Sequence, residues 1–293
     1  MDKISILGGK TLEGTITISG SKNAALPILV SSLLTRETSN LDNVPNLLDI
    51  TTMKELLISL GIKIVTKEKS LFIEPSNNIS THADYELVRK MRASVLVLGP
   101  LLARFGEAEV SLPGGCAIGS RPVDIHINAL KKMGAKLEIK DGYIKASVPN
   151  KKLVGADITF PKVSVGATEN IIMAACLAKG KTTIRNAALE PEIDDLITVL
   201  NKMGACVYRV DSNKIEVEGV NNLKGFSHSV MPDRIEAGTY AMAAVITAGR
   251  IELLKAEEKY LKNVVKYLNK VGAKIESTYN GINIEGPKVI NNI

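Results

Sequence analysis

The sequence repeats one pattern four times, and this repeat limits the possible folds more than any other feature. In each copy a segment with helical periodicity ends at a glycine, and successive glycines lie 73, 70 and 68 residues apart. These glycines are Gly61, Gly134, Gly204 and Gly272. A leucine stands four positions before each of them, and an aliphatic residue or methionine stands one position before. Because these positions share one helical face and glycine suits a left-handed C-terminal cap, we expect four helices that end at glycine and lead into strands.

A second kind of helix is expected in each copy. It is rich in small apolar residues on nearly all sides, and it is predicted at residues 24–34, 93–103, 165–178 and 237–248. A helix that is apolar all round is buried. Each is followed by a polar turn and a predicted strand, at residues 38–41, 108–112, 182–186 and 250–254. One unit is therefore buried helix, strand, amphipathic helix, strand, strand.

Several such units favour an α/β fold with the buried helices packed inward and the sheets outside. The alternative is a generic doubly wound sheet, for which about 70 residues per unit is long. The length of 293 residues favours two domains. No apolar stretch approaches the roughly 18 to 20 residues of a membrane span, and the N-terminus lacks the pattern of a signal peptide. We therefore expect a cytoplasmic protein that does not bind a membrane.

Composition and charge narrow the possible partners. The formal net charge of +6 favours anionic ligands, but the chain has no Trp, only 4% aromatic residues and scattered lysines, so we expect no nucleic-acid binding. The three cysteines lack CxxC spacing and the three histidines stand far apart. Neither a disulfide framework nor a metal site is predicted. No Gly-x-Gly-x-x-Gly follows a strand, so no nicotinamide, flavin or other cofactor is expected.

A glycine-rich segment at residues 110–125 is the strongest candidate site. Cys116 lies among three glycines, which permit close approach of a ligand, and Arg121 can bind a phosphate or carboxylate through two hydrogen bonds. The alternative is that Cys116 is a buried cysteine that acts as a small apolar residue. A P-loop is a further alternative from the spacing of Gly114 and Gly119, but Ser120 and Arg121 replace its lysine and hydroxyl residue.

Six motifs in order resemble one enzyme family. They are residues 14–27, 91–94, 112–125, 162–168, 190–193 and 232–236. From residue 5 to its end the chain is similar to the UDP-N-acetylglucosamine enolpyruvyl transferases, also called 1-carboxyvinyltransferases. The resemblance implies two inside-out α/β domains, each with three repeated units around buried helices, and an active site in the cleft between them. It also implies that residues 22–231 form one complete three-unit domain with the Cys116 loop, that residues 1–21 and 232–293 form a partial second domain, and that the sequence is truncated at its C-terminus.

The resemblance implies transfer of the enolpyruvyl group of phosphoenolpyruvate to the 3-hydroxyl of UDP-N-acetylglucosamine, with release of phosphate. This is the first committed step of peptidoglycan synthesis, on which cell shape and division depend. By resemblance Cys116 is the proton donor, can form a covalent adduct with the pyruvyl unit and is the target of fosfomycin. Lys22 and Asn23 match contacts to phosphoenolpyruvate, Arg121 matches the phosphate clamp and Arg92 a substrate-binding arginine.

The resemblance assigns two segments to the nucleotide sugar. They are Arg121, Pro122, Val123, Asp124 and Ile125, together with Lys162, Val163, Ser164 and Val165. Free amides at the helix that starts after Ser164 could also face an anion. Lys22 and Lys162 could instead be solvated surface lysines. Glu190 and Asp233 match polar residues of the cleft, but each could equally be an acid at a helix start.

The resemblance leaves alternatives open. The nearest is an enolpyruvyl transferase that acts on shikimate 3-phosphate, and another is a noncatalytic ligand-binding fragment. The general base of the family is expected beyond residue 293, so we expect impaired turnover from this chain. Cys176 and Cys206 are expected to be inert core thiols.

Overall fold

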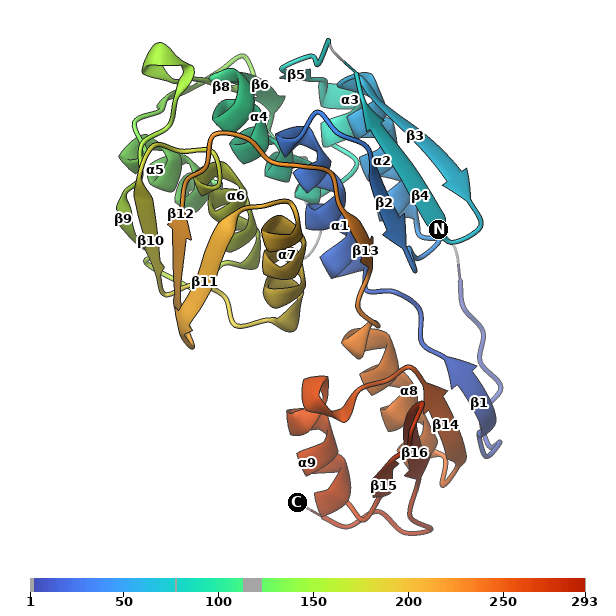
Figure 1. Ribbon diagram of the computed structural model, residues 1–293. Helices are drawn as coiled ribbons and strands as arrows, with labels where there is room; N and C mark the ends of the chain where they lie inside the picture. Colours follow the sequence, from blue (N-terminus) through green and yellow to red (C-terminus); the bar gives the residue numbers. More distant parts are fainter. Residues whose placement is uncertain (1–2, 77, 113–122, 293) are drawn as a thin grey trace. The chain divides into compact units, whose positions relative to one another are not determined.

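The computed structural model describes residues 3–76, 78–112 and 123–292. It divides into two compact units (Figure 1). The larger unit is Lys22–Met231, and the smaller unit combines Met1–Ser21 with Pro232–Ile293. No helix among the described residues is long and apolar enough to cross a membrane.

The larger unit contains three four-stranded sheets of the same design. In each sheet the first two strands are parallel, and the second, third and fourth strands pair antiparallel. The strand orders are β13-β2-β4-β3, β5-β6-β8-β7 and β9-β10-β12-β11. The first sheet comprises β13 (Ser227–Ser229), β2 (Ser39–Asp42), β4 (Ser70–Pro75) and β3 (Ile62–Lys67). The second sheet comprises β5 (His82–Ala83), β6 (Glu107–Ser111), β8 (Tyr143–Ser147) and β7 (Lys136–Lys140). The third sheet comprises β9 (Asp157–Thr159), β10 (Lys181–Arg185), β12 (Lys214–Glu218) and β11 (Cys206–Asp211).

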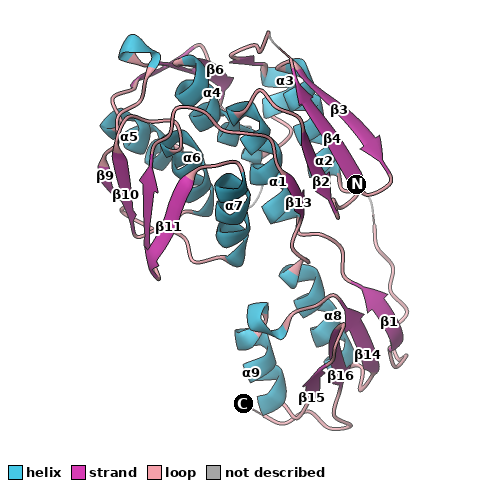
Figure 2. Ribbon diagram, in the orientation of Figure 1, coloured by secondary structure: helices cyan, strands magenta, loops and turns pink. Residues whose placement is uncertain are grey.

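Each of these sheets is accompanied by two main helices. The first helix of each unit is α1 (Lys22–Ser31), α4 (Leu98–Phe105) or α6 (Val165–Ala175), and the second is α2 (Leu48–Ser59), α5 (Asp124–Lys132) or α7 (Pro191–Lys202). Short helices complete the unit: η1 (Ser32–Leu34), α3 (Tyr85–Val88), η2 (Arg92–Val97) and η3 (Pro149–Lys151). Strands lie at the periphery of the larger unit, with α1 and α7 between sheets (Figure 2).

The smaller unit has one sheet with the same design, in the order β1-β14-β16-β15. Its strands are β1 (Glu13–Thr17), β14 (Arg250–Leu254), β16 (Gly281–Glu285) and β15 (Lys274–Ser277), and its helices are α8 (Arg234–Ile246), η4 (Glu258–Tyr260) and α9 (Lys262–Lys270). β1 and β14 are parallel although more than 200 residues separate them in sequence. Side chains of α8, α9 and the sheet form its core.

The repeat predicted from the glycines is confirmed. Each copy runs helix, strand, helix, strand, strand in chain order. The four glycines have φ values of +104°, +89°, +94° and +100°, each two residues after the end of an α-helix. Only glycine adopts this left-handed conformation without strain, so these positions act as the predicted helix caps. The first strand in each of these sheet orders, β13, β5, β9 or β1, was not part of the predicted repeat.

Two of the predicted buried helices differ from expectation. Residues 93–103 do not form one helix: η2 is a 3-10 helix and α4 follows it. Pro100 explains this break, because it has no N–H for the carbonyl of Leu96 and its ring would clash there. It is tolerated in the first turn of α4, where an N–H would have no helical partner.

The second difference concerns α8, which was expected to be buried on all sides. Ile235, Met242 and Ile246 are 53%, 51% and 74% exposed, whereas Ala237, Ala241 and Ala244 are almost fully buried. The single sheet of the smaller unit and α9 cover only one face of α8 in the described structure. The prediction of burial all round is therefore wrong for this helix.

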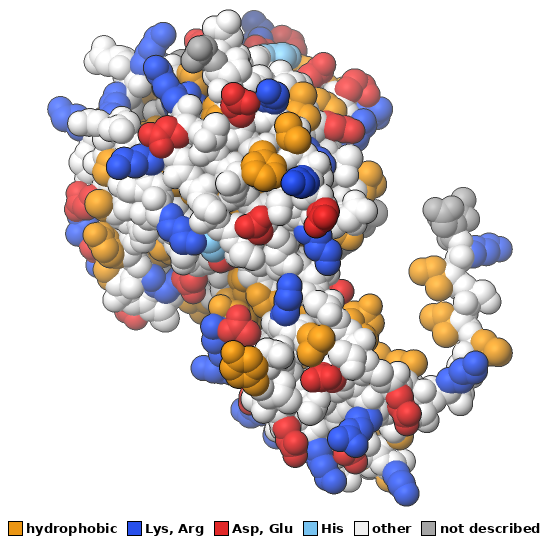
Figure 3. Space-filling model, turned by 45° about the vertical axis from the view of Figure 1, so that its right-hand side comes forward, with side chains coloured by type: hydrophobic (Ala, Val, Ile, Leu, Met, Phe, Trp, Pro, Cys, Tyr) orange, Lys and Arg blue, Asp and Glu red, His pale blue; other side chains and the backbone are white. Residues whose placement is uncertain are grey.

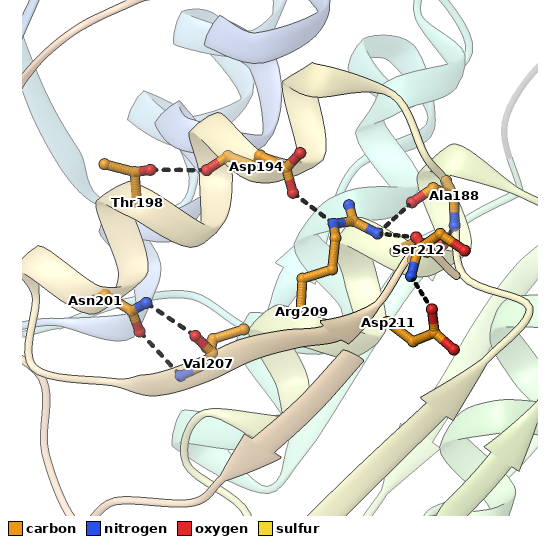
Figure 4. A network of polar contacts seen from close by, with 9 residues as sticks. Ala188, Asp194, Thr198, Asn201, Val207, Arg209, Asp211 and Ser212 are labelled. Atoms are coloured by element: carbon orange, nitrogen blue, oxygen red, sulfur yellow. Dashed lines mark hydrogen bonds and ion pairs between the residues drawn. The ribbon is translucent and has the colours of Figure 1, made fainter. Parts of the chain in front are cut away.

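A polar network fixes the start of α7 against β11 (Figure 4). Arg209 donates from Nε to Asp194 Oδ1 at 2.6 Å, and from Nη1 to the carbonyl oxygens of Ala188 and Ser212 at 3.1 and 2.9 Å. Farther along α7, the amide of Asn201 pairs with both backbone groups of Val207 at 2.9 Å. These bonds hold the loop that leads into α7.

Candidate functional site

The predicted site residues fall into three groups by position. Cys116, Arg121 and Pro122 lie outside the described residues. Asp233 lies in the smaller unit. The larger unit holds Lys22, Asn23, Arg92, Val123, Asp124, Ile125, Lys162, Val163, Ser164, Val165 and Glu190.

Most of these residues in the larger unit stand at the start of a helix. Lys22 is the first residue of α1, Arg92 the first of η2 and Asp124 the first of α5, and Ser164 is the N-cap of α6. Backbone N–H groups in the first helical turn have no partner within the helix and carry partial positive charge. A set of helix starts that also carries Lys and Arg is therefore suited to bind phosphate or carboxylate groups.

The start of α6 has a defined local structure. Ser164 Oγ accepts a hydrogen bond from the Ala167 amide at 3.3 Å. The Thr168 hydroxyl donates to the Ser164 carbonyl at 2.8 Å and accepts from the Ala188 amide at 3.0 Å. These bonds do not use the amides of Val165 and Gly166, which can therefore face a ligand. Lys162 and Val163 are exposed on the loop before the helix.

Lys22 forms an ion pair with Asp49 in the first turn of α2. The Nζ–Oδ2 distance is 2.7 Å, and each side chain is 37% exposed. A cation at a helix N-terminus is disfavoured by the helix dipole, and the Asp49 carboxylate offsets this cost. Lys22 is therefore not simply a solvated turn residue. Asp49 was not predicted as part of the site.

His126 connects several of the predicted residues. Its side chain on α5 is only 5% exposed, and a Cβ atom at Gly166 would lie 3.5 Å from Cε1 of the ring. Burial and then the charge of Arg92 lower the pKa of His126 to about 4, although Asp124 acts in the opposite direction. The ring is thus neutral at pH 7, and it lies close to Arg92, Asp124 and the start of α6.

A second group of buried residues links α6 to α7. Glu169 is 4% exposed, and burial, followed by the charges of Glu192 and Glu190, raises its pKa well above the usual value. Glu190 is the N-cap residue of α7 but makes no side-chain cap bond. Its Oε2 atom is buried without a hydrogen-bond partner in the described part of the chain.

Asp233 differs from Glu190 in this respect. Its Oδ1 atom accepts hydrogen bonds from the amides of Ile235 and Glu236 at 2.7 and 3.1 Å. Asp233 is the N-cap of α8, as expected under the alternative that it is an acid at a helix start.

The two cysteines outside the glycine-rich segment differ in burial. Cys176 is fully buried, its thiol contacts the Ile172 carbonyl at 3.3 Å, and burial raises its pKa strongly. This agrees with the prediction of an inert core thiol. Cys206 is the first residue of β11, as expected, but it is only partly buried.

On the face that Figure 3 shows, basic and acidic side chains are interspersed. Among the candidate residues, cationic charge is found at helix starts, on individual side chains such as Lys22 and Arg92.

Comparison with known proteins identifies the family. The family described as EPSP synthase (3-phosphoshikimate 1-carboxyvinyltransferase) matches residues 6–292. Proteins named UDP-N-acetylglucosamine 1-carboxyvinyltransferase from Pelagibacter ubique, Paramagnetospirillum magneticum and Endomicrobium trichonymphae are 53%, 52% and 54% identical to the chain. These alignments cover 100%, 97% and 98% of the chain and 70%, 68% and 69% of the relatives. The chain belongs to this family of enolpyruvyl transferases.

Solved structures confirm the predicted fold. The enolpyruvyl transferase NikO from Streptomyces tendae has a TM-score of 0.83 at 17% identity, over 96% of this chain and 67% of that one. EPSP synthase from Acinetobacter baumannii has a TM-score of 0.74 at 19% identity, over 98% of this chain and 67% of that one. The inside-out α/β architecture is thus shared with enzymes of distant sequence. The expectation that further repeats follow residue 293 stays a prediction.

Four residues that shape this region were missed by sequence reasoning: Asp49, His126, Glu169 and Asn170. His126 follows Asp124 by two positions in a predicted motif, and this proximity was the available signal. Glu169 and Asn170 lie within a helix predicted to be buried, where a polar side chain needs a partner. That signal was present, but the sequence does not say which partners they meet.

Proposed function

We propose that the chain acts in the transfer of the enolpyruvyl group from phosphoenolpyruvate to the 3-hydroxyl of UDP-N-acetylglucosamine, with release of phosphate. The reaction is the first committed step of peptidoglycan synthesis, and cell shape and division depend on it. The observation that carries this proposal is the identity of 52% to 54% with relatives of that name over nearly the whole chain.

The proposed chemistry is addition followed by elimination. Cys116 donates a proton to the methylene carbon of phosphoenolpyruvate and can bond covalently to the pyruvyl unit. Lys22, Asn23 and Arg121 bind the phosphate and carboxylate of the same substrate. The ion pair with Asp49 supports the role of Lys22, because it holds an ammonium group at the start of α1.

The nucleotide sugar is proposed to bind at the starts of α5 and α6. The residues assigned to it are Arg92, Arg121, Pro122, Val123, Asp124, Ile125, Lys162, Val163, Ser164 and Val165, with Glu190 and Asp233 as further candidates. The closeness of the His126 ring to Gly166 supports this grouping, because His126 lies in the first turn of α5 and Gly166 in the first turn of α6. Cationic side chains and free amides at these starts match the charge of a diphosphate.

The competing acceptor is shikimate 3-phosphate, because the description of the matching family includes 3-phosphoshikimate. The names of the relatives at more than 50% identity favour the nucleotide sugar instead. We also propose a cytoplasmic location. The free thiols of Cys176 and Cys206 support a reducing compartment.

A mass-labelling experiment tests the proposed site. The protein is incubated with fosfomycin, an epoxide that mimics phosphoenolpyruvate, in the presence of UDP-N-acetylglucosamine, and its peptides are analysed by mass spectrometry. We expect an adduct on Cys116, with Cys176 and Cys206 unmodified, and no adduct in the folded Cys116→Ala variant. Equal labelling of all three cysteines would contradict the assignment. Phosphate release from the two substrates measures turnover of the chain directly.

A further inference from the structure

The larger unit contains a buried polar centre that the proposed reaction does not use. Asn170 on α6 is fully buried, and its side chain contacts three other elements. Its Oδ1 atom accepts from the Gly99 amide at 2.7 Å, and its Nδ2 atom donates to the Val95 carbonyl at 3.1 Å. The same Nδ2 atom lies 3.0 Å from Nδ1 of His126. One side chain therefore joins η2, α4, α5 and α6.

These bonds fix the orientation of the Asn170 amide. The Gly99 N–H is a donor, so it must face the amide oxygen. The amide nitrogen then faces the Val95 carbonyl and the His126 ring, and its two hydrogens match these two acceptors. Nδ1 of His126 must therefore accept a hydrogen bond, which places the single ring proton of a neutral imidazole on Nε2.

The groups around His126 keep the ring neutral and leave this proton available. Burial and the nearby Arg92 disfavour a second proton, and they outweigh Asp124 on the same helix. A Cβ atom at Gly166 would lie 3.7 Å from Nε2, so this edge of the ring lies at the first turn of α6. In the part of the chain that the structure describes, no residue accepts a hydrogen bond from Nε2.

We infer that Asn170 is a positioning residue that holds His126 in one tautomer, with its Nε2–H directed at a phosphate group of a ligand bound at the start of α6. The inference rests on the proposed function, which supplies a nucleoside diphosphate sugar as the ligand. A donor fixed in advance binds an oxyanion without reorganisation, and a neutral ring does so at every pH above its own pKa. The opposite tautomer would present a lone pair to the anion and repel it.

The first test uses the unaltered protein. The full chain is labelled with ¹⁵N-histidine, and the chemical shifts of both ring nitrogens of His126 are followed from pH 5.5 to 8, without and with UDP-N-acetylglucosamine. We expect a neutral ring with the proton on Nε2 throughout, and a change of the Nε2 signal when the nucleotide sugar binds. A proton on Nδ1, or a doubly protonated ring at pH 7, would overturn the inference.

Two variants separate positioning from folding. Asn170→Asp keeps the shape but offers only acceptors, so Nδ1 becomes protonated and the affinity for the nucleotide sugar becomes dependent on pH between 6 and 8. His126→Phe removes the donor, and its dissociation constant for the nucleotide sugar is expected to rise about 10-fold or more. Asn201→Asp is the matched control, because the Asn201 side chain bonds to the backbone of Val207 and not to His126 in the described residues, so the His126 signals should stay unchanged.

The outcomes distinguish this inference from the proposed function. If the unaltered protein does not bind UDP-N-acetylglucosamine, the proposed function fails, whereas the nitrogen shifts still decide the tautomer. If it binds and His126→Phe binds equally well, only the role of His126 is refuted. If Asn170→Asp leaves the His126 shifts and the pH dependence unchanged, Asn170 does not position the ring.

Discussion

The helices α6 and α8 occupy the same position in the repeat, yet their surroundings differ. All residues from Ala167 to Ala175 of α6 are buried, whereas α8 exposes Ile235, Met242 and Ile246. In the larger unit three sheets and several helices surround the first helices of the repeats, and in the smaller unit one sheet and α9 cover one face of α8. An apolar composition on all sides therefore shows that a helix can be buried, but the number of repeats around it decides how much of it is buried.

The largest effect is expected from the core of α6. Ile172 is fully buried, and Ile172→Ala should lower the free energy of unfolding of the larger unit by about 2 to 5 kcal/mol through the cavity it leaves. The matched change in α8 is Met242→Ala at a half-exposed position, and it should lower the free energy of unfolding of the smaller unit by less than about 1 kcal/mol. Hydrogen exchange measured on peptides from each helix reports the two units separately. Equal losses would show that the two helices are equally buried in solution.

A pH-dependent effect is expected from the buried carboxyl group of Glu169, which has no counterpart among the described residues of the smaller unit. Its pKa is raised in the folded state, so between about pH 4.5 and that higher value the folded chain holds a proton that the unfolded chain releases. Stability is therefore lost as the pH rises through this window. Glu169→Gln should remove this loss of stability with rising pH and stabilise the larger unit at pH 7.

The control for this prediction is Glu138→Gln, at an exposed position on β7. Denaturation with urea at several pH values between 5 and 8 measures both variants. If the free energy of unfolding of Glu169→Gln still falls as the pH rises, the pH dependence comes from other groups.

Helix capping should contribute similarly to the stability of both units. Ser164 caps α6 through the Ala167 amide, and Asp233 caps α8 through the amides of Ile235 and Glu236. Ser164→Ala and Asp233→Ala should each lower the free energy of unfolding by about 1 kcal/mol, because each removes the oxygen that accepts from amides of the first helical turn. Asp233→Ser should recover most of the loss in α8. Local hydrogen exchange at each helix start measures the effect, and an unchanged exchange rate in Asp233→Ala would exclude the cap.

The smallest effect on stability is expected on the exposed stripe of α8, which comprises Ile235, Met242 and Ile246. Ile246→Lys should change the free energy of unfolding by no more than about 0.5 kcal/mol, because this side chain is 74% exposed. Ala244→Lys, on the buried face of the same helix, should unfold the smaller unit. Thermal unfolding compares the two variants. Severe destabilisation by Ile246→Lys would mean that another surface covers the stripe in solution.

The repeated architecture could be predicted from the sequence because its signals are local. Helical periodicity and a terminal glycine depend on neighbouring residues, and so the five elements of the repeat were predicted in the right order in all four copies. The additional strands β13, β5, β9 and β1 were not predicted. The pairing of β13 with β2 could not be predicted, since the two strands are nearly 190 residues apart and short. The break before α4 also has a local signal in the sequence, because Pro100 disfavours a continuous α-helix through the preceding turn.

The candidate site was predictable only in part, for a similar reason. Motifs identified Lys22, Arg92 and Ser164 because these residues stand in recognisable local sequences. Asp49, the partner of Lys22, comes from another helix, and Asn170 on α6 contacts His126 on α5. Only the packing of these helices brings the paired residues into contact. Charge and burial then set the protonation of His126 and Glu169, and these properties depend on the three-dimensional environment.

The choice of acceptor is the most direct test of the central claim. Isothermal titration of the purified chain with UDP-N-acetylglucosamine, and separately with shikimate 3-phosphate, measures this choice without requiring turnover. The account predicts saturable binding of the nucleotide sugar and no comparable binding of shikimate 3-phosphate. Binding of shikimate 3-phosphate in preference to the nucleotide sugar would contradict it.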